Sequence, residues 1–448
     1  MSQDPARVAV IGAGPSGLYA AAALLTSEVP VSVEVLDRLP APYGLVRYGV
    51  APDHVKMKSV IRVLQKPFDP ALVEFLGGVR VGTGGIGLDV LRQHFHAVVH
   101  ATGSAVDRGL GVPGEELAGS YGSGEFVSWY CGHPDFVKLD PPLDHPGVAV
   151  VGAGNVALDV ARVLARSAAE MAATDVPDRV LDALRGSAVR DVHILIRRGP
   201  QHVRFTPAEL RQIGDLADAD VIVHDDGLLA AGVAEPEDRR QKQNLAMLTE
   251  WAGGAGGTAP RRVHLRFLRS PVRLNGENGR VSSIVVERNR IDEDGRVVGT
   301  GEEETLAVGL VVRAIGYAAE PIPGLPFDAA TGTVPNDGGR VLADGVPVPG
   351  EYVTGWIKRG PTGVIGTNKG DANETVAALL ADLPGLPPPT RPEPAQLREA
   401  LAAAGIRPVD WTGWLRLDAE EIRRGGMREA ERVKVADLAE MLEMAHGT

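Results

Sequence analysis

Two short glycine-rich segments have the pattern that binds the pyrophosphate of a dinucleotide. The first, Gly12-Ala13-Gly14-Pro15-Ser16-Gly17, follows the apolar run Val8–Ile11, and the second, Gly152-Ala153-Gly154-Asn155-Val156-Ala157, follows Val148–Val151. In such a segment the first glycine allows a tight turn, the second lets the backbone approach phosphate, and the third small residue lets a helix pack on a strand. The N–H groups that begin this helix then face the phosphates. The sequence therefore predicts two dinucleotide sites.

The two sites differ in the charge of the side chains at the end of the next strand, the one that follows each glycine-rich segment and its helix. Asp37 follows the run Val31–Leu36, about 20 residues beyond the first segment, where a carboxylate binds ribose hydroxyls. Arg197 and Arg198 follow Val192–Ile196, and paired guanidinium groups suit a ribose 2′-phosphate. Alternatively, the two arginines form a basic strand end that is solvated and binds no phosphate. Two cofactors of different kinds indicate electron transfer rather than binding alone.

A third glycine-rich segment, Gly355–Lys369, has an aromatic side chain near its start. It contains four glycines and Trp356, and it precedes a helix predicted over Asp371–Leu383. N–H groups in this loop would face a flavin ring, with Trp356 beside the ring. The alternative is a tryptophan that packs in a structural loop.

The elements that must position these segments alternate between strands and helices. Continuous apolar runs predict buried parallel strands, and stretches rich in Ala and Leu predict helices. The sequence thus predicts an α/β fold with two Rossmann-like domains. After a proline-rich linker, Pro384–Pro394, two amphipathic helices are expected, the second over Arg432–Met444. Further strands are predicted at Val79–Val81, Ala97–His100, Val263–Phe267, Ser282–Arg288 and Leu310–Arg313.

Composition excludes several classes of protein. The 448 residues have a formal net charge of −12, which argues against general nucleic-acid binding. The single cysteine, Cys131, rules out an intramolecular disulfide, a Cys-x-x-Cys pair and a thiolate metal cluster. No metal is expected. Neither a secretory signal nor an apolar run of about 20 residues is found. A cytoplasmic protein, a monomer by preference, is therefore predicted.

Four segments together resemble the adrenodoxin reductase family of ferredoxin–NADP reductases, and most closely its actinobacterial members. They are Gly355–Lys369, Gly152–Arg162, Tyr43–Arg47 with Gly49–His54, and Arg197–Pro200. The resemblance runs from Arg7 to about Leu383. It implies FAD in the first domain, NADPH in the second, hydride transfer between them, and single-electron transfer to a ferredoxin. The implied order is FAD domain 1–104, inserted NADPH domain 105–324, and a return to the FAD domain over 325–448.

The resemblance also implies which residues contact each cofactor. This chain departs from the family at Asp37, where the family usually has Glu, but the shorter carboxylate still reaches ribose oxygens. The motif glycines are Gly12, Gly14 and Gly17 at the FAD site and Gly152 and Gly154 at the NADPH site. The other expected FAD contacts are Ala13, Asp37, Leu45, Val81, Trp356, Gly363, Val364 and Ile365. The expected NADP contacts are Asn155, Val156, Arg197, Arg198, Glu209 and Gly363.

Three weaker candidates complete the prediction. His54, in a Pro-Asp-His loop near the expected flavin, would relay protons or have a structural role. Glu209 would order the arginines or a ribose. A basic cluster of Arg239, Arg240 and Lys242, or else Lys358 and Arg359, would steer an acidic ferredoxin, although a solvated helix face explains such a cluster equally.

Two other functions stay open on the sequence alone. One is another NADPH-dependent flavoprotein, such as a flavin monooxygenase, which would react rapidly with oxygen once reduced; a disulfide reductase is excluded by the single cysteine. The other is a non-catalytic nucleotide-binding protein, which would bind NADPH without reducing a dye.

Overall fold

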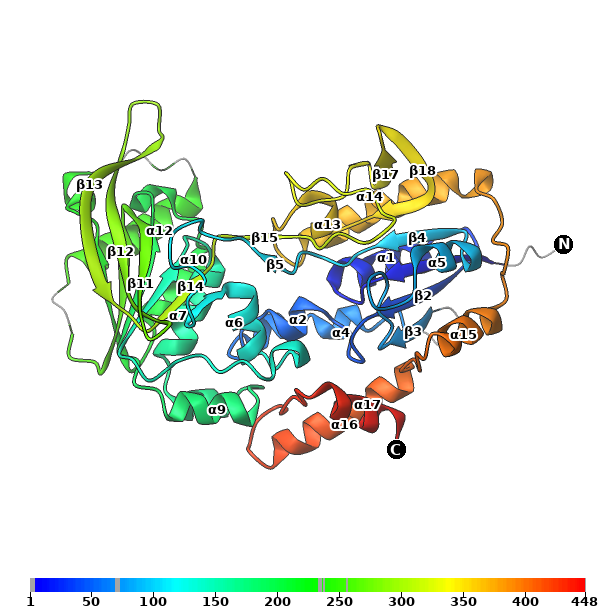
Figure 1. The fold of residues 1–448 in the computed structure, drawn as a ribbon, viewed down its shortest axis with the longest axis horizontal. Helices are drawn as coiled ribbons and strands as arrows, with labels where there is room; N and C mark the ends of the chain where they lie inside the picture. The colour runs from blue at the N-terminus through cyan, green and yellow to red at the C-terminus, as the bar shows by residue number, and fades with distance from the viewer. Residues whose placement is uncertain (1–4, 69–72, 233–235, 237, 255–256, 448) are drawn as a thin grey trace.

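Two sheets built mainly from parallel strands form the framework of the molecule (Figure 1). The computed structural model describes residues 5–68, 73–232, 236, 238–254 and 257–447. The first sheet combines the two ends of the chain, because a strand from its last third pairs with the N-terminal strands. In the order of the sheet, its strands are β16 (Asn336–Asp337), β17 (Arg340–Ala343), β18 (Val346–Val353), β4 (Ala97–His100), β1 (Ala6–Ile11), β2 (Val31–Asp37) and β3 (Val73–Gly77).

Helices cover both faces of the first sheet, as the apolar character of β1 and β2 requires. On one face α1 (Pro15–Leu25) packs beside α14 (Thr367–Asp382), and on the other face lie α5 (Leu88–His94) and α15 (Pro394–Ala403). The predicted strand Ala97–His100 is confirmed.

The second sheet is built wholly from the middle of the chain. Its strands, in order, are β6 (Ser120–Gly122), β14 (Leu310–Arg313), β7 (Gly147–Val151), β8 (Asp191–Ile196), β10 (Arg261–Phe267) and β9 (Ala219–His224). One face is covered by α6 (Ser123–Tyr130), α7 (Asn155–Ala165), α10 (Pro207–Gly214) and α12 (Arg239–Ala252). The other face packs on an antiparallel sheet of β11 (Arg269–Glu277), β12 (Arg280–Ile291) and β13 (Val297–Ala307).

The chain crosses between the two sheets twice, side by side. Strand β5 (Val106–Asp107) leads out of the first unit and β15 (Tyr317–Ala318) leads back, and the two pair antiparallel (Figure 1). The fold is therefore α/β, with two Rossmann-like domains and the second inserted into the first. The domain limits at 104/105 and 324/325 stay a prediction.

Most of the remaining helices are short. They are α2 (Leu45–Tyr48), α3 (Val55–Lys58), α4 (Ile61–Leu64), α8 (Ala168–Ala172), α9 (Asp178–Arg185), α11 (Leu228–Ala231), α13 (Trp356–Arg359), α16 (Trp411–Gly426) and α17 (Leu438–His446), the last two being longer and forming the C-terminal segment. No helix among the described residues is long and apolar enough to cross a membrane.

Two predicted elements are wrong. Val79–Val81 is not a strand: the strand of this region is β3, which ends at Gly77 because Gly78 turns with a φ of 75°, and Val81 makes only a single bridge to Ile86. The prediction of two terminal helices also fails, because α15, α16 and α17 follow the linker.

The last helix begins later than predicted because the residues before it are bound elsewhere. Val433 donates its backbone N–H to the carbonyl of Glu421, and Val435 donates to the Glu421 carboxylate. These contacts keep the segment extended and buried. Asp437 then accepts the N–H of Glu440 and starts α17 at Leu438. Periodicity alone does not report such long-range bonds.

The C-terminal segment fastens the two domains together. Asp175, in the second domain, accepts hydrogen bonds from Lys58 of the first domain at 2.7 Å and lies 3.0 Å from Lys434 of the C-terminal segment. Burial would raise the pKa of Asp175, but the charges of the two lysines lower it to about 2. Nearby, Arg47 of α2 pairs with the buried Glu421 of α16. Three parts of the chain thus share one buried charge network.

Replacing Lys434 by Met should lower the free energy of unfolding by about 3 kcal/mol, because the buried Asp175 loses one of its two cations. Thermal unfolding followed by circular dichroism measures this effect. Lys138→Met, at an exposed position, is the matched control. Equal melting temperatures for the two variants would contradict the role of Lys434.

Candidate active site

The first glycine-rich loop forms a cradle that only glycine permits. Gly12 has a φ of +105°, and a Cβ there would lie 2.5 Å from the carbonyl oxygen of Ala101. A Cβ on Gly17 would lie 1.9 Å from the carbonyl oxygen of Gly12. Among the described residues, no side chain caps the N-terminus of α1, which starts after Gly14, and its first turn has no acidic residue. These N–H groups fit the phosphates of a dinucleotide.

The second glycine-rich loop repeats this geometry in the second domain. A Cβ on Gly152 would lie 2.3 Å from the carbonyl oxygen of Ala314, which takes the place that Ala101 has in the first cradle. The space beside Gly154 is open, and within the described part of the chain no side chain caps α7. Ala157 is fully buried where α7 packs on the sheet. This loop also fits a dinucleotide phosphate.

The charged side chains at the two strand ends differ in their interaction partners. Asp37 accepts the backbone N–H groups of Ala13 at 2.8 Å and Leu39 at 2.9 Å, so its carboxylate holds the first cradle in shape. Burial raises the pKa of Asp37, against the effect of these hydrogen bonds. Arg197 is exposed and Arg198 half-buried, and no acidic side chain among the described residues pairs with either guanidinium.

A third arginine beside the second cradle was missed by the sequence analysis. The backbone N–H of Arg204 donates to the carbonyl of Ala153, so this exposed residue lies against the glycine-rich loop. In the same turn, Thr206 donates its backbone N–H to the side chain of Asn155 at 2.9 Å. The signal for Arg204 in the sequence was a further basic residue seven positions after Arg197.

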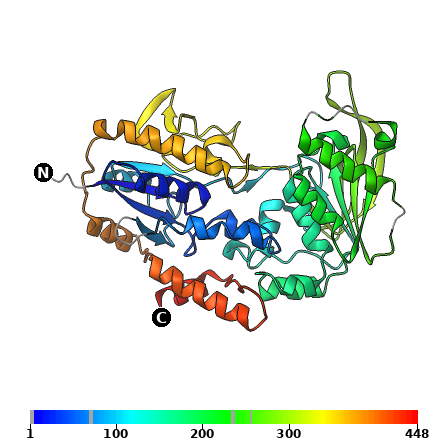
Figure 2. The same ribbon diagram turned by 180° about the vertical axis from the view of Figure 1, so that it is seen from behind.

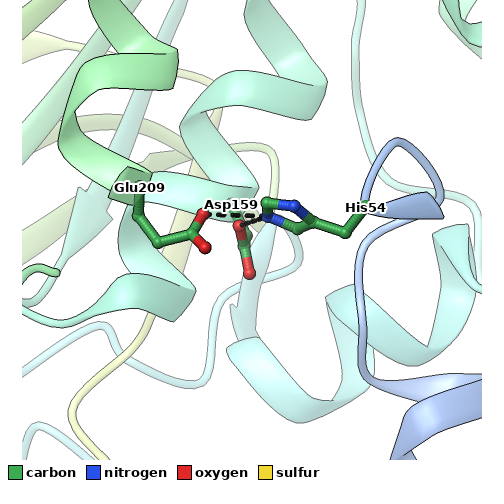
Figure 3. Close-up of side chains that lie close together, drawn as sticks. All are labelled: His54, Asp159 and Glu209. Carbon is green, nitrogen blue, oxygen red and sulfur yellow. Dashed lines mark hydrogen bonds and ion pairs between the residues drawn. The ribbon is translucent and has the colours of Figure 1, made fainter. Parts of the chain in front are cut away.

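His54 of the first domain reaches into the second domain (Figure 3). Its Nε2 lies 3.0 Å from Asp159 of α7 and 2.9 Å from Glu209 of α10. Burial would lower the pKa of His54, but the hydrogen bonds to the two carboxylates raise it to about 9. The imidazole is therefore protonated at neutral pH. The sequence predicted different roles for His54 and Glu209, whereas in the structure their side chains are in contact.

Arg162 completes this group and makes it an ion network rather than a cation site. Its side chain is fully buried, and its Nη1 lies 2.8 Å from Asp159 and 3.5 Å from Glu209. Its Nε donates to Asp53, in the loop just before His54, at 2.6 Å. Burial would raise the pKa of Asp53, but hydrogen bonding to Arg162 lowers it. The sequence analysis gave Asp53, Asp159 and Arg162 no role.

The Gly355–Lys369 loop lies against the first cradle. A Cβ on Gly355 would lie 2.2 Å from the hydroxyl of Ser16. Trp356 stacks on Tyr317 of β15, with ring centroids 6.2 Å apart and planes 14° apart. Gly363 has a φ of +84°, Val364 is 66% exposed, and Ile365 packs toward the core of the first domain.

The other predicted residues have more varied surroundings. Leu45, 44% exposed, begins α2 just after Gly44, whose Cα would lie 3.8 Å from a Cβ on Gly14. Val81 forms a bridge with Ile86. Val156 is half-buried at the start of α7. Lys358 and Arg359 both pair with Asp371, so they are not the free basic cluster that the sequence suggested. Arg239, Arg240 and Lys242 are exposed at the start of α12.

Comparison with known proteins gives full-length matches. The profile described as "Pyridine nucleotide-disulphide oxidoreductase" matches residues 6–213. The chain is 41% identical to NADPH-ferredoxin reductase FprA of Mycobacterium tuberculosis, over 99% of this chain and all of FprA. It is 36% identical to mitochondrial NADPH:adrenodoxin oxidoreductase of Arabidopsis thaliana, over 99% and 96% of the two chains. The structure of Mycobacterium tuberculosis FprA in complex with NADPH superposes with a TM-score of 0.92 at 40% identity, covering 99% of this chain and all of that one.

Substituting Gly17 by Ala should abolish binding of the dinucleotide at the first cradle, because the new Cβ would collide with the Gly12 carbonyl. The measurement is the amount of dinucleotide released per protein chain on denaturation of the purified protein. Gly370→Ala, in α14 with no atom within 4 Å of the new Cβ, is the control and should retain it. Retention by both variants would show that this cradle is not the site.

Proposed function

The chain belongs to the adrenodoxin reductase-like family of NADPH–ferredoxin reductases, and we propose that it carries electrons from NADPH to an acidic ferredoxin. It is a flavoprotein oxidoreductase with FAD and NADP(H) as cofactors. The observation that carries the proposal is the pair of glycine cradles. The strand after the first cradle ends in Asp37, and the strand after the second leads into Arg197 and Arg198. A cytoplasmic location is proposed with it.

The first cradle is assigned to FAD and the second to NADPH. FAD accepts two electrons as hydride and releases them singly. Asp37 would fix the ribose end, and Trp356 with Gly363 to Ile365 would cover the ring. The N–H groups of Asn155 and Val156 would bind the NADPH pyrophosphate. Arg197 and Arg198, which have no acidic partner among the described residues, are assigned to its 2′-phosphate.

His54 is proposed to hold a proton at the junction of the two domains. Its Nε2 contacts both Asp159 and Glu209, so the imidazolium carries a proton that the two carboxylates keep in place. Glu209, expected at the nucleotide, is proposed to act through His54 and Arg162. Both residues would fix where the nicotinamide end meets the flavin end and limit the entry of water there.

Arg239, Arg240 and Lys242 are proposed to attract the ferredoxin. They are exposed on α12 in a chain whose formal net charge is −12, so they form a local positive field.

Competing functions fit the structure less well. A disulfide reductase needs a thiol pair, whereas Cys131 is the only cysteine and burial raises its pKa to about 11. A non-catalytic binding protein has no need for a buried charged junction between two cradles. A flavin monooxygenase would show itself by rapid reaction of the reduced protein with oxygen.

The proposal is tested by mixing the purified protein anaerobically with NADPH or NADH and following flavin absorbance. Faster bleaching by NADPH, followed by ferredoxin-dependent reduction of cytochrome c, is the expected result. A protein that neither nucleotide bleaches is not a reductase. Rapid reoxidation by oxygen with inert ferredoxin would favour the monooxygenase.

Changing Arg197 and Arg198 together to Ala should raise the KM for NADPH by roughly 100-fold, because two charge-assisted contacts to the 2′-phosphate are lost. The KM for NADH, which has no such phosphate, should hardly change. Steady-state ferricyanide reduction measures both constants. Arg190→Ala, at an exposed position before β8, is the control. Equal loss with both nucleotides would assign the two arginines elsewhere.

His54→Gln should reduce thermal stability in a pH-dependent way. The pKa of His54 is about 9 in the folded protein and about 6.5 when unfolded, so the protonated ring stabilises the fold fully below pH 6.5. This contribution, about 2 kcal/mol after allowance for solvent screening, disappears as the pH rises to 9. Flavin release on heating, from pH 6 to pH 10, follows it.

The difference between wild type and His54→Gln should therefore be large at pH 6 and small at pH 10. His145→Gln is the control, since His145 pairs with no acidic side chain among the described residues. A difference that is constant over this range would mean that His54 is not held as a cation.

A further inference from the structure

A short segment directly after His54 is basic and exposed. Residues 55–66, named here the 55–66 segment, contain four basic side chains and no acidic one, in a chain with a formal net charge of −12. The segment includes α3 and α4. Figure 2 shows these helices near the centre of the face that also presents α1 and α12. The proposed function uses none of these residues.

The segment also exposes apolar side chains. Val55 is 53%, Met57 41% and Val63 50% exposed, and four of the thirteen exposed large apolar side chains of the described residues lie between Leu45 and Val63. Leu64 is buried and anchors the segment on the first domain. Exposed apolar side chains that are grouped, rather than scattered singly, mark interaction surfaces.

Basic side chains are interspersed with these apolar ones along the segment. Lys56, Arg62 and Lys66 are exposed, and within the described part of the chain none of them has an acidic partner. The fourth, Lys58, is bound to Asp175 and fixes the segment against the second domain. Protein–protein interfaces combine exposed apolar side chains with charged ones, and this segment has both. The free charges select a partner of opposite sign.

We propose that the 55–66 segment is a docking surface for an acidic ferredoxin, with Val55, Met57 and Val63 in the contact and Lys56, Arg62 and Lys66 at its rim. This inference rests on the proposed function. The segment starts one residue after His54, which contacts Asp159 and Glu209 at the junction of the two cradles. A protein docked here lies beside the redox site, whereas the α12 cluster acts at longer range.

A charge-reversal variant, Lys56→Glu with Arg62→Glu and Lys66→Glu, tests the surface. The probes are purified acidic [2Fe–2S], [3Fe–4S] and [4Fe–4S] ferredoxins, with cytochrome c as final acceptor. The KM for the ferredoxin that the wild type uses should rise at least about tenfold at low salt and less at 0.5 M salt. Bleaching of the flavin by NADPH and reduction of ferricyanide should not change.

Two further variants separate local contact from overall charge. Arg280→Glu with Arg290→Glu and Arg296→Glu makes the same charge change on β12 and the turn after it, and should leave the KM for ferredoxin near the wild-type value. Met57→Gln with Val63→Gln keeps the charge, and should raise the KM at both salt concentrations because it removes apolar contact.

Two results overturn the proposal, each in a different way. If the 55–66 reversal and the β12 reversal change the KM equally, the segment does not bind ferredoxin. If the wild type binds vesicles of phosphatidylglycerol through this segment and the KM for ferredoxin is unaffected, its partner is an anionic membrane. A wild type that reduces ferricyanide but no ferredoxin contradicts the proposed function itself.

Discussion

The buried ion pair between Arg162 and Asp53 is the constraint on which the rest of the structure depends. The chain passes between the two domains through two short paired strands, which by themselves fix the relative position of the domains poorly. Arg162, fully buried on α7, binds Asp53 from the first domain through two nitrogens. Because a buried charge without its partner is costly, the domains are held where this pair forms. That position also places His54 between Asp159 and Glu209.

The same stretch of the first domain is held at a second point. Lys58 lies four residues after His54, and it binds Asp175, which Lys434 also binds. The short helix α3 is thereby fixed to the second domain at both ends, and the C-terminal segment takes part in fixing it. Because the backbone of α3 is held at both ends, a partner that binds beyond it orders little additional backbone there. The charges that hold the two domains together thus also shape the proposed docking surface.

Features determined by local sequence could be predicted, and those determined by distant contacts could not. The glycine cradles, the strands Ala97–His100 and Leu310–Arg313, and the opposite strand-end charges all follow from residues a few positions apart. The Arg162–Asp53 pair joins residues 109 positions apart, so no periodicity reports it. The start of α17 was misplaced for the same reason, because Glu421 holds Val433 and Val435 extended. The assignment of each residue to a cofactor stays a prediction.

The two cradles have similar backbone geometry, but the charged side chains beside them differ in their exposure to solvent and in their hydrogen-bond partners. This difference suits two kinds of ligand. Asp37 is half-buried and already bonded to two backbone N–H groups, so a ligand that binds it joins a rigid, preformed site. Arg197 is exposed and Arg198 half-buried, and among the described residues neither guanidinium pairs with an acidic side chain. A preformed site favours a resident cofactor such as FAD, because little order is lost on binding. Guanidinium groups open to solvent favour rapid capture and release, as an exchanging nucleotide requires.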